Sequence, residues 1–314
     1  MQSKMWFTIT AALGAFLLWA VTSIVLYFTP PVPVSLLQRM HIPTGFIALI
    51  MFLPHALLAG VYFMYRPRES VAFKHWSGWA YFRNTFFPIK MINNKPYERE
   101  YIILYAVVPH GIFPVSVMFG IILNPAFGHV TVAVTSLLFW IPIARELTCL
   151  AGCAPANTAD IIGLLDRGRS VLVTPEGMRA ALHYNEPDGV MRVLRGIPGE
   201  SAPRKGFIRC ATGSTNHARI RIVPVYCEGE LELYTVWNVF PWLQRTLLLT
   251  YRYPWPVLAF GWWGTPWPKP RPLTLHFGEP ISLMCGDAMR DVDDVHKEYC
   301  SAVDALLNAA RQRA

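Results

Sequence analysis

The stretch YIILYAVV, residues 101–108, followed by Pro109-His110-Gly111, decides the fold. Its unbroken run of apolar and aromatic residues predicts a β-strand. Similar runs predict further strands at residues 130–134, 170–174, 219–226 and 273–277. The fold therefore depends on what connects these strands.

Helical patterns fall between the predicted strands. Residues 158–167 have Asn157 or Thr158 as the N-cap, Asp160 in the first turn, and Gly168 just beyond the end. Residues 205–212 and 292–311 predict two more helices. Strands that alternate with helices predict a layered α/β domain, with a mixed sheet flanked by helices.

The composition points to lipid contact. Hydrophobic residues make up 53% of the 314 residues, charged residues 15%, and the mean hydropathy is +0.31. The net charge is +8, but the Lys and Arg residues are dispersed and no nucleic-acid motif appears, so we exclude nucleic acid. An anionic membrane or a phosphate-bearing substrate fits this charge better. The six cysteines form no C-x-x-C pair, which favours buried thiols in a reducing compartment.

Residues 5–28 and 42–65 are two runs without a charged side chain, and each is long enough to span a bilayer. Prolines at 30, 31 and 33 separate them, so residues 1–70 predict a transmembrane helical hairpin, followed by a globular domain at 71–314. Pro54 leaves a re-entrant second helix open. Lys4 and the basic residues after 65 place both termini in the cytosol. The first run is too long for a cleaved signal peptide.

Three segments next to predicted strands or helices carry candidate chemistry. His110 follows the first strand and can act as a general base, with Gly111 leaving room for a substrate; a lone histidine is more often structural. The block TPEGMR, residues 174–179, follows the third strand and offers Glu176 and Arg179 on either side of Gly177; the alternative is a surface turn.

The third segment, RKGF at residues 204–207, begins a predicted helix. A basic helix start is suited to the phosphates of coenzyme A, and the alternative is a solvated basic face. Residues 234–270 are rich in Trp and Pro. They predict either a surface that lies on the membrane or lines an acyl channel, or an ordinary Trp-rich core loop.

Further blocks follow in order along the chain: PIARE (142–146), GCAP (152–155), RKGF (204–207), VPV (223–225), GELELY (229–234) and GEPI (278–281). Together with Pro109-His110-Gly111, these blocks resemble the type-2 diacylglycerol acyltransferase family, which includes monoacylglycerol and wax-alcohol acyltransferases. The resemblance covers roughly residues 75–310, and the N-terminal hairpin also suits the family.

Two positions depart from the family pattern. Val108 stands where the family carries the first histidine of His-Pro-His-Gly, so the resemblance assigns the base to His110. The block TPEG, residues 174–177, is instead similar to the Phe-Pro-Glu-Gly-Thr-Arg motif of lysophospholipid acyltransferases. Those enzymes also carry an Asp five residues after the histidine, where this chain has Val115. A lysolipid acceptor therefore stays open.

The resemblance implies transfer of an acyl group from acyl-CoA to a lipid hydroxyl, with diacylglycerol as the acceptor and triacylglycerol as the product. Monoacylglycerol, a fatty alcohol or a lysophospholipid are alternative acceptors, and a catalytically inactive lipid-binding protein is an alternative of another class. An esterase is disfavoured, because the chain has no Gly-x-Ser-x-Gly motif. The family also implies the endoplasmic reticulum membrane or a lipid droplet as the location, and allows a homo-oligomer.

His110 is then the base, and Glu146 and Glu176 are the candidates for the acid that orients it. The matching motif positions predict substrate contacts; they are Pro109, Gly111, Arg145, Gly177, Arg179, Arg204, Lys205, Gly206 and Glu230. Acyl-CoA is a substrate in this scheme, and we expect neither a cofactor nor a metal.

Overall fold

A computed structural model describes residues 53, 57, 60, 62–65, 67–94, 100–186, 188–198, 201–251 and 257–313. The first arm of the predicted hairpin, residues 5–28, lies outside the described residues, as does most of the second arm, 42–65. Within the described ranges, none of the helices combines the length and apolar character that crossing a bilayer requires.

The chain divides into two compact units. The first unit joins Met1–Phe73 to Leu137–Gly152, and the second unit contains Lys74–Ser136 and Cys153–Ala314. The boundary predicted after residue 70 lies close to the first division, but nothing in the sequence indicates that residues 137–152 belong with the N-terminal part.

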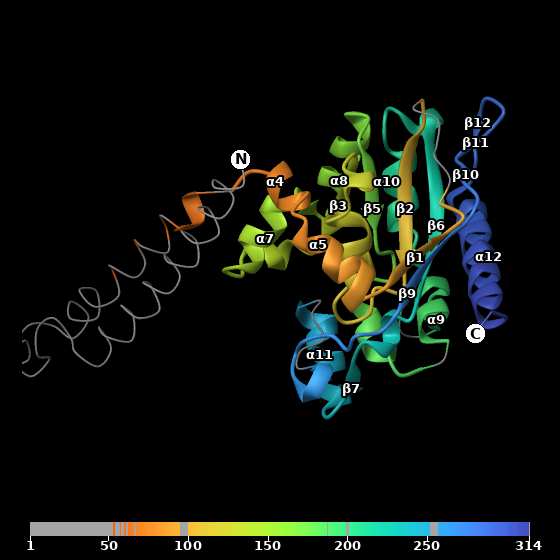
Figure 1. Cartoon of the computed structure of the whole chain (residues 1–314). Coiled ribbons are helices and arrows are strands. Elements are labelled where there is room, and N and C mark those ends of the chain that lie inside the picture. The colour runs from red at the N-terminus through yellow and green to blue at the C-terminus, as the bar shows by residue number, and fades with distance from the viewer. Residues whose placement is uncertain are drawn as a thin grey trace, which may run out of the picture. The chain divides into compact units, whose positions relative to one another are not determined.

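A mixed eight-stranded sheet forms the centre of the second unit (Figure 1). Its order is β1-β9-β6-β2-β5-β3-β4, with β10 added against β6. Neighbours run parallel except at the β6–β9 and β6–β10 pairs, which are antiparallel. The strands are β1 (Ile89–Ile92), β2 (Ile102–Val108), β3 (Val130–Val134), β4 (Ala154–Pro155), β5 (Ser170–Val173), β6 (Ile220–Glu228), β9 (Leu273–Phe277) and β10 (Ile281–Ser282).

Two short hairpins complete the described strands: β7 (Thr235–Trp237) with β8 (Leu258–Phe260), and β11 (Met284–Cys285) with β12 (Ala288–Met289). The five strands predicted from the sequence are confirmed as β2, β3, β5, β6 and β9, with ends that differ by at most two residues. The strands that were not predicted have only two to four residues, too few to show a periodic pattern.

Helices alternate with the strands along most of the chain, as predicted, with α4 and α5 before β1 and α12 after the last strand. They are α4 (Val71–Lys74), α5 (Gly78–Tyr81), α6 (Val115–Val117), α7 (Ala144–Leu150), α8 (Thr158–Asp166), α9 (Gly189–Arg195), α10 (Gly206–Thr212), α11 (Pro241–Tyr251) and α12 (Val292–Arg311). Two π-helical turns, η1 (Phe82–Phe86) and η2 (Met118–Ile122), accompany them. The 3₁₀ turns are η3 (Pro125–Phe127), η4 (Ser136–Phe139), η5 (Gly177–His183), η6 (His217–Arg219), η7 (Glu230–Glu232) and η8 (Trp262–Gly264).

The three helices predicted from sequence are confirmed as α8, α10 and α12. Local chemistry explains the start of two of them. The Asn157 side chain accepts a hydrogen bond from the amide of Asp160, and Asp291 does the same for Asp293 at α12. A side chain that satisfies a free amide at a helix start stabilises the helix by about 1 kcal/mol.

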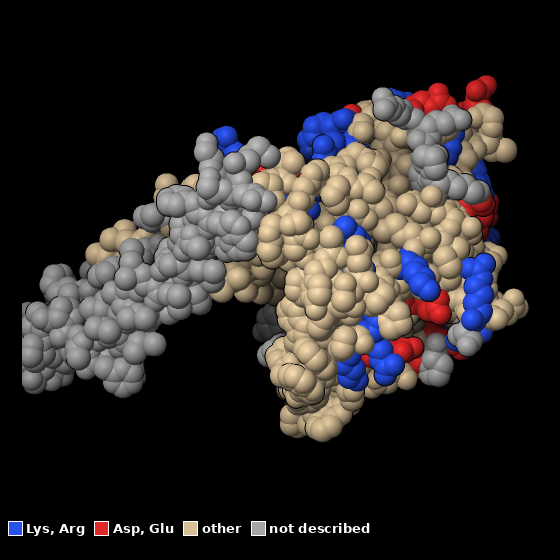
Figure 2. Space-filling view, in the orientation of Figure 1, with Lys and Arg blue, Asp and Glu red and all other residues tan. Residues whose placement is uncertain are grey.

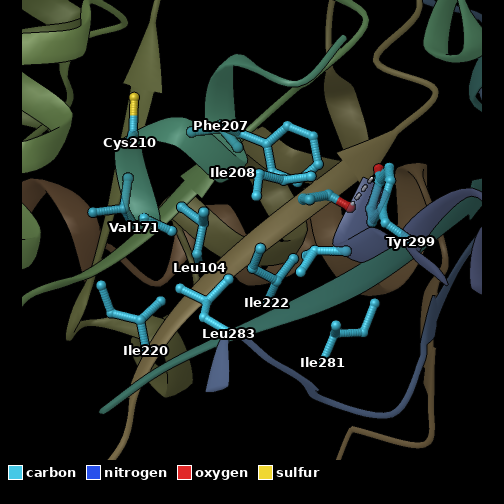
Figure 3. Packing of buried hydrophobic residues seen from close by; sticks show 14 of the residues in the cluster. Leu104, Val171, Phe207, Ile208, Cys210, Ile220, Ile222, Ile281, Leu283 and Tyr299 are labelled. Atoms are coloured by element: carbon cyan, nitrogen blue, oxygen red, sulfur yellow. Dashed lines mark hydrogen bonds between the residues drawn. The ribbon is translucent and has the colours of Figure 1, made fainter. Parts of the chain in front are cut away.

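The central strand β2 is buried along its whole length. Its even-numbered residues, such as Leu104, pack with residues of α8, α10 and α12, while its odd-numbered residues, such as Tyr105, pack with residues of α6, η2 and η3. Figure 3 shows Leu104 among Val171, Ile222 and residues of α10. Tyr299 of α12 also donates a hydrogen bond to the carbonyl oxygen of Ala106, at 3.3 Å. Packing on both faces therefore holds β2 in place, and with it the start of the loop after Val108.

Four tryptophans of the Trp-rich segment, residues 234–270, lie at the surface. Trp237, Trp242, Trp263 and Trp267 are all exposed, and Trp263 is 83% exposed. This excludes the packed-loop interpretation for these four residues, while membrane contact stays a prediction. On the face drawn in Figure 2, charged side chains stand in separate groups with wide uncharged areas between them.

Candidate active site

The loop that carries His110 begins where β2 ends. Pro109 follows a cis peptide bond and is buried, and His110 is half-buried. Gly111 has φ +63°, a left-handed conformation that favours glycine. A Cβ atom at this position would also lie 3.3 Å from Cγ of Glu230. Conformation and close approach both explain the glycine after His110.

Val108 belongs to the core rather than to the surface of the site. Its side chain is fully buried and packs in the cluster that contains Leu104, Ala106 and Ile222. The position that holds the first histidine in the resembling family is thus filled here by an apolar core residue. His110 is the histidine that this loop presents.

Glu176 holds the main chain of His110. It follows β5, which pairs with β2 in the sheet, and its Oε1 accepts a hydrogen bond from the amide of His110. The carboxyl group is completely buried, and burial raises its pKa, while His110 and Arg204 act in the opposite direction. Its second oxygen, Oε2, has no hydrogen-bond partner among the described residues.

The ring of His110 is oriented by Gly177. Its Nε2 lies 3.0 Å from the carbonyl oxygen of Gly177. A carbonyl oxygen can only accept, so we assign the ring proton to Nε2. This tautomer leaves Nδ1 as the nitrogen that can take up a proton. Glu176 and Gly177, two neighbouring residues of one turn, thus fix both the main chain and the ring of His110.

Glu230 holds the other end of the same loop. It is buried, and its Oε1 and Oε2 accept hydrogen bonds from the amides of Val115 (2.7 Å) and Ser116 (3.0 Å). Burial raises the pKa of Glu230 to about 7; Glu176 acts in the same direction, and the bonds from Val115 and Ser116 oppose it. The contacts give Glu230 a part in positioning the loop, while contact with a substrate stays a prediction.

The two basic side chains of the block at residues 204–207 interact with different parts of the protein. Arg204 is half-buried and interacts electrostatically with Glu176 and Arg179; burial lowers its pKa, and Arg179 acts in the same direction. The buried Nε of Arg204 has no hydrogen-bond partner among the described residues. Lys205 instead pairs with Asp293 of α12, at 2.6 Å. Gly206 is the exposed first residue of α10.

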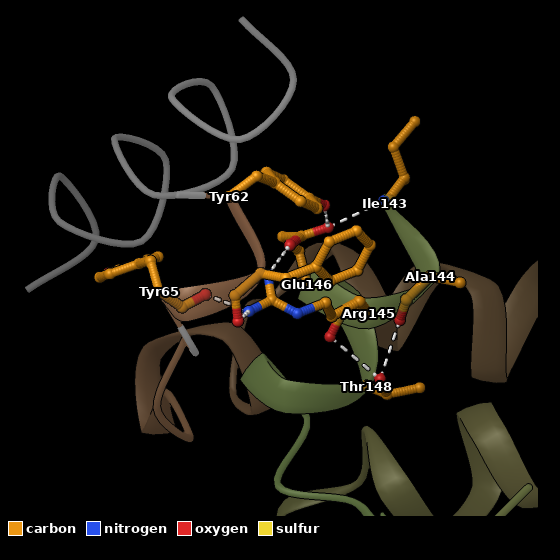
Figure 4. Close-up of polar contacts among 8 residues, drawn as sticks. Tyr62, Tyr65, Ile143, Ala144, Arg145, Glu146 and Thr148 are labelled. Carbon is orange, nitrogen blue, oxygen red and sulfur yellow. Dashed lines mark hydrogen bonds and ion pairs between the residues drawn. The ribbon is translucent and has the colours of Figure 1, made fainter. Parts of the chain in front are cut away.

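Arg145 and Glu146 lie in the first unit and contact each other (Figure 4). Nη1 of Arg145 donates to Glu146 at 2.8 Å, and Nη2 donates to the carbonyl oxygens of Phe63 and Tyr65. Glu146 also accepts from the hydroxyl of Tyr62 (2.6 Å) and the amide of Ile143 (2.8 Å). Of the two acids predicted to orient the base, Glu176 is therefore the one that the structure places against His110.

The sequence did not identify several of these contacts. Gly177 lies in a predicted block, but its role as a carbonyl acceptor is not apparent from the sequence. The amides of Val115 and Ser116 and the hydroxyl of Tyr62 lie outside the predicted blocks. In the described part of the chain, no group of three or more His, Cys, Asp or Glu side chains could hold a metal ion. The six cysteines are free thiols.

Comparison with known proteins identifies a family for this chain. Residues 42–314 match the family model described as "Diacylglycerol acyltransferase". The chain is 28% identical, over 275 residues, to "Diacylglycerol O-acyltransferase 2-like protein 6" of Homo sapiens. The match covers 77% of this chain and 75% of that relative. The Bos taurus protein of the same name is also 28% identical, over 274 residues, with the same coverage.

A solved structure is also similar to this chain. It is the crystal structure of the 1-acyl-sn-glycerophosphate (LPA) acyltransferase PlsC from Thermotoga maritima, with a TM-score of 0.43 and 13% sequence identity. The match covers 94% of this chain and 95% of that chain.

Replacement of Glu230 by Gln should change how stability depends on pH. Because the folded-state pKa of Glu230 is raised from 4.5 to about 7, the folded protein binds its proton more tightly than the unfolded chain. The stability that Glu230 contributes is therefore fully present below pH 4.5 and is lost as the pH rises through 7. Relative to Glu230→Gln, the wild type should lose up to about 3 kcal/mol across this window.

Thermal unfolding of both proteins in detergent, from pH 4.5 to 8, measures this difference. Glu232→Gln is the matched control, because Glu232 is an exposed carboxyl two residues further along the chain. The control should follow the wild-type profile. Parallel profiles for wild type and Glu230→Gln would contradict the assigned burial of a titrating carboxyl at this position.

Proposed function

The chain belongs to the diacylglycerol acyltransferase family and is an acyltransferase enzyme, and on that basis we propose that it transfers a fatty acyl group from acyl-CoA to diacylglycerol, forming triacylglycerol. One observation carries the proposal: His110 stands at the carboxyl end of the central strand, with its main chain bonded to Glu176 and its ring to Gly177. In α/β sheets, the carboxyl ends of strands are where ligands bind.

The proposed reaction uses Nδ1 of His110 as the general base. Nδ1 takes the proton of the acceptor hydroxyl while the hydroxyl oxygen attacks the thioester carbonyl carbon of acyl-CoA. The resulting oxyanion re-forms the carbonyl, the carbon–sulfur bond breaks, and coenzyme A leaves as a thiolate that takes the proton back from the imidazolium. The atoms balance without a metal or a cofactor.

Glu176 and Glu230 act in this scheme as positioning residues. Glu176 holds the amide of His110 and so fixes the direction in which the ring leaves the strand. Glu230 holds the amides of Val115 and Ser116, at the far end of the loop. A base held at both ends of its loop loses little freedom when the substrates bind, which favours a reaction between two large lipids.

Arg204 supplies positive charge close to Glu176, and Arg179 lies close enough to Arg204 to interact with it electrostatically. They are candidates to bind a phosphate of coenzyme A. The same two residues favour a second candidate function, in which the acceptor is a lysophospholipid and its phosphate binds here. The similarity of residues 174–177 to the motif of lysophospholipid acyltransferases points in the same direction.

We also propose that the protein is located in a membrane. The two charge-free runs, residues 5–28 and 42–65, favour a multi-pass anchor in the endoplasmic reticulum membrane with both termini in the cytosol. The exposed tryptophans of residues 234–270 favour further contact with that membrane, or with a lipid droplet. Assembly as a homo-oligomer belongs to the same proposal.

His110→Ala should reduce acyl transfer about 10²- to 10⁴-fold, because the reaction loses its general base. Microsomes that contain the full chain, supplied with labelled acyl-CoA and diacylglycerol, measure this rate. His217→Ala is the control; His217 is half-buried in η6, with its Nδ1 bonded to a carbonyl oxygen, and its removal should leave the rate within about twofold. Wild-type activity in His110→Ala would exclude His110 as the base.

Diacylglycerol should be the preferred acceptor when it competes with monoacylglycerol, a long-chain alcohol and a lysophospholipid for the same labelled acyl-CoA. Identification of the labelled product separates the candidate functions. Preference for the lysophospholipid, lost in Arg179→Gln, would support the second candidate. No labelled product from any acceptor, with folded protein, would favour an inactive lipid-binding protein.

A further inference from the structure

Residues 137–147 in the first unit expose a row of large apolar side chains. The segment includes η4 except its first residue, and the start of α7, and Trp140 is 67% exposed. Leu137, Ile141, Ile143 and Leu147 are also exposed. Five such side chains within eleven residues are more than the scattered apolar residues of an ordinary surface.

The charged side chains of this segment are hidden. Arg145 and Glu146 are its only charged residues, and each is 4% exposed. They form an ion pair of 2.8 Å, and their remaining groups bond to Phe63, Tyr65, Tyr62 and Ile143. The guanidinium group also lies against the rings of Tyr62 and Phe63, at 5.0 and 5.5 Å from their centres.

Exposed apolar side chains beside a buried ion pair are unusual at a surface that faces water. At a water-exposed surface, Arg and Glu side chains normally extend into the solvent while apolar side chains turn inward. Here the charges are paired inside, and apolar atoms form the outside. In a lipid environment, by contrast, polar groups must find partners within the protein, and apolar side chains face the surroundings at no cost.

The segment is also continuous with the part of the chain that the sequence predicts to lie in the membrane. Tyr62 and Phe63 stand at the end of the charge-free run 42–65. The hydroxyl of Tyr62 donates to Glu146, and the ring of Phe63 lies 5.7 Å from that of Trp140. Leu53, Leu57 and Met64 of the same unit are exposed as well.

We propose that residues 137–147 insert into the lipid layer beside the N-terminal run and form a further membrane contact of the enzyme, separated from that run in sequence. The partner is the hydrocarbon and interfacial layer of a bilayer. The buried Arg145–Glu146 ion pair permits insertion, because it keeps both charges away from the lipid-facing surface. This proposal does not depend on which lipid accepts the acyl group.

Spin labels measure the depth of the segment in a bilayer. The full chain is reconstituted into phosphatidylcholine vesicles with the exposed Cys285 replaced by Ser, and a label is attached at Trp140→Cys. Lys297→Cys is the matched control, since the Lys297 side chain is 78% exposed on α12. Cys285→Ser without an added cysteine gives the background signal. Leu147→Cys is a second site, in case Trp140→Cys fails to fold.

Molecular oxygen concentrates in the hydrocarbon, whereas a neutral nickel chelate stays in water. We expect oxygen to relax the labels at 140 and 147 at least threefold more effectively than the chelate does, relative to the control label. Equal access of the chelate to all labels would place the segment in water and overturn the proposal. Labels that neither reagent reaches would show that protein covers the segment, through a second copy or another partner, and would also overturn it.

Discussion

The hydrogen bond from the amide of His110 to the buried carboxyl of Glu176 connects the ends of two neighbouring parallel strands. Packing on both faces holds β2 in place, and the carboxyl lies in the turn after β5. The position of the base therefore depends on the core of the sheet as well as on the loop. A displacement of β2 or β5 would therefore also move the imidazole of His110.

A second buried carboxyl completes this arrangement. Glu230 bonds to the amides at the start of α6, and Gly111 leaves room for its side chain. Burial raises the pKa of both carboxyls, and each is offset by hydrogen bonds from the main chain of the His110 loop. The loop needs the carboxyls for its shape, and the carboxyls need the loop amides to be tolerated in the interior. This mutual dependence explains why acidic residues occupy such a dry region.

The sequence predicted the helices and strands that have a recognisable pattern within their own residues. The strands β2, β3, β5, β6 and β9 have long apolar runs, and α8 and α12 have capping residues, so each could be recognised alone. Strands such as β4 and β10 have two residues each and form by pairing with a neighbouring strand, so they have no recognisable sequence pattern of their own. The motif positions identified Glu176, Glu230 and Arg145, but their roles follow from contacts between distant residues. Tyr62 and Glu146, for example, are 84 positions apart.

The central claim is that the imidazole of His110 acts as the base in acyl transfer. The most direct test adds free imidazole to His110→Ala in membranes supplied with acyl-CoA and the acceptor lipid, and measures the initial rate against imidazole concentration. The account predicts a rate that rises with the concentration of unprotonated imidazole and then saturates, with no rise in the wild type. A rate that does not respond to imidazole at any pH, in a folded variant, would contradict it.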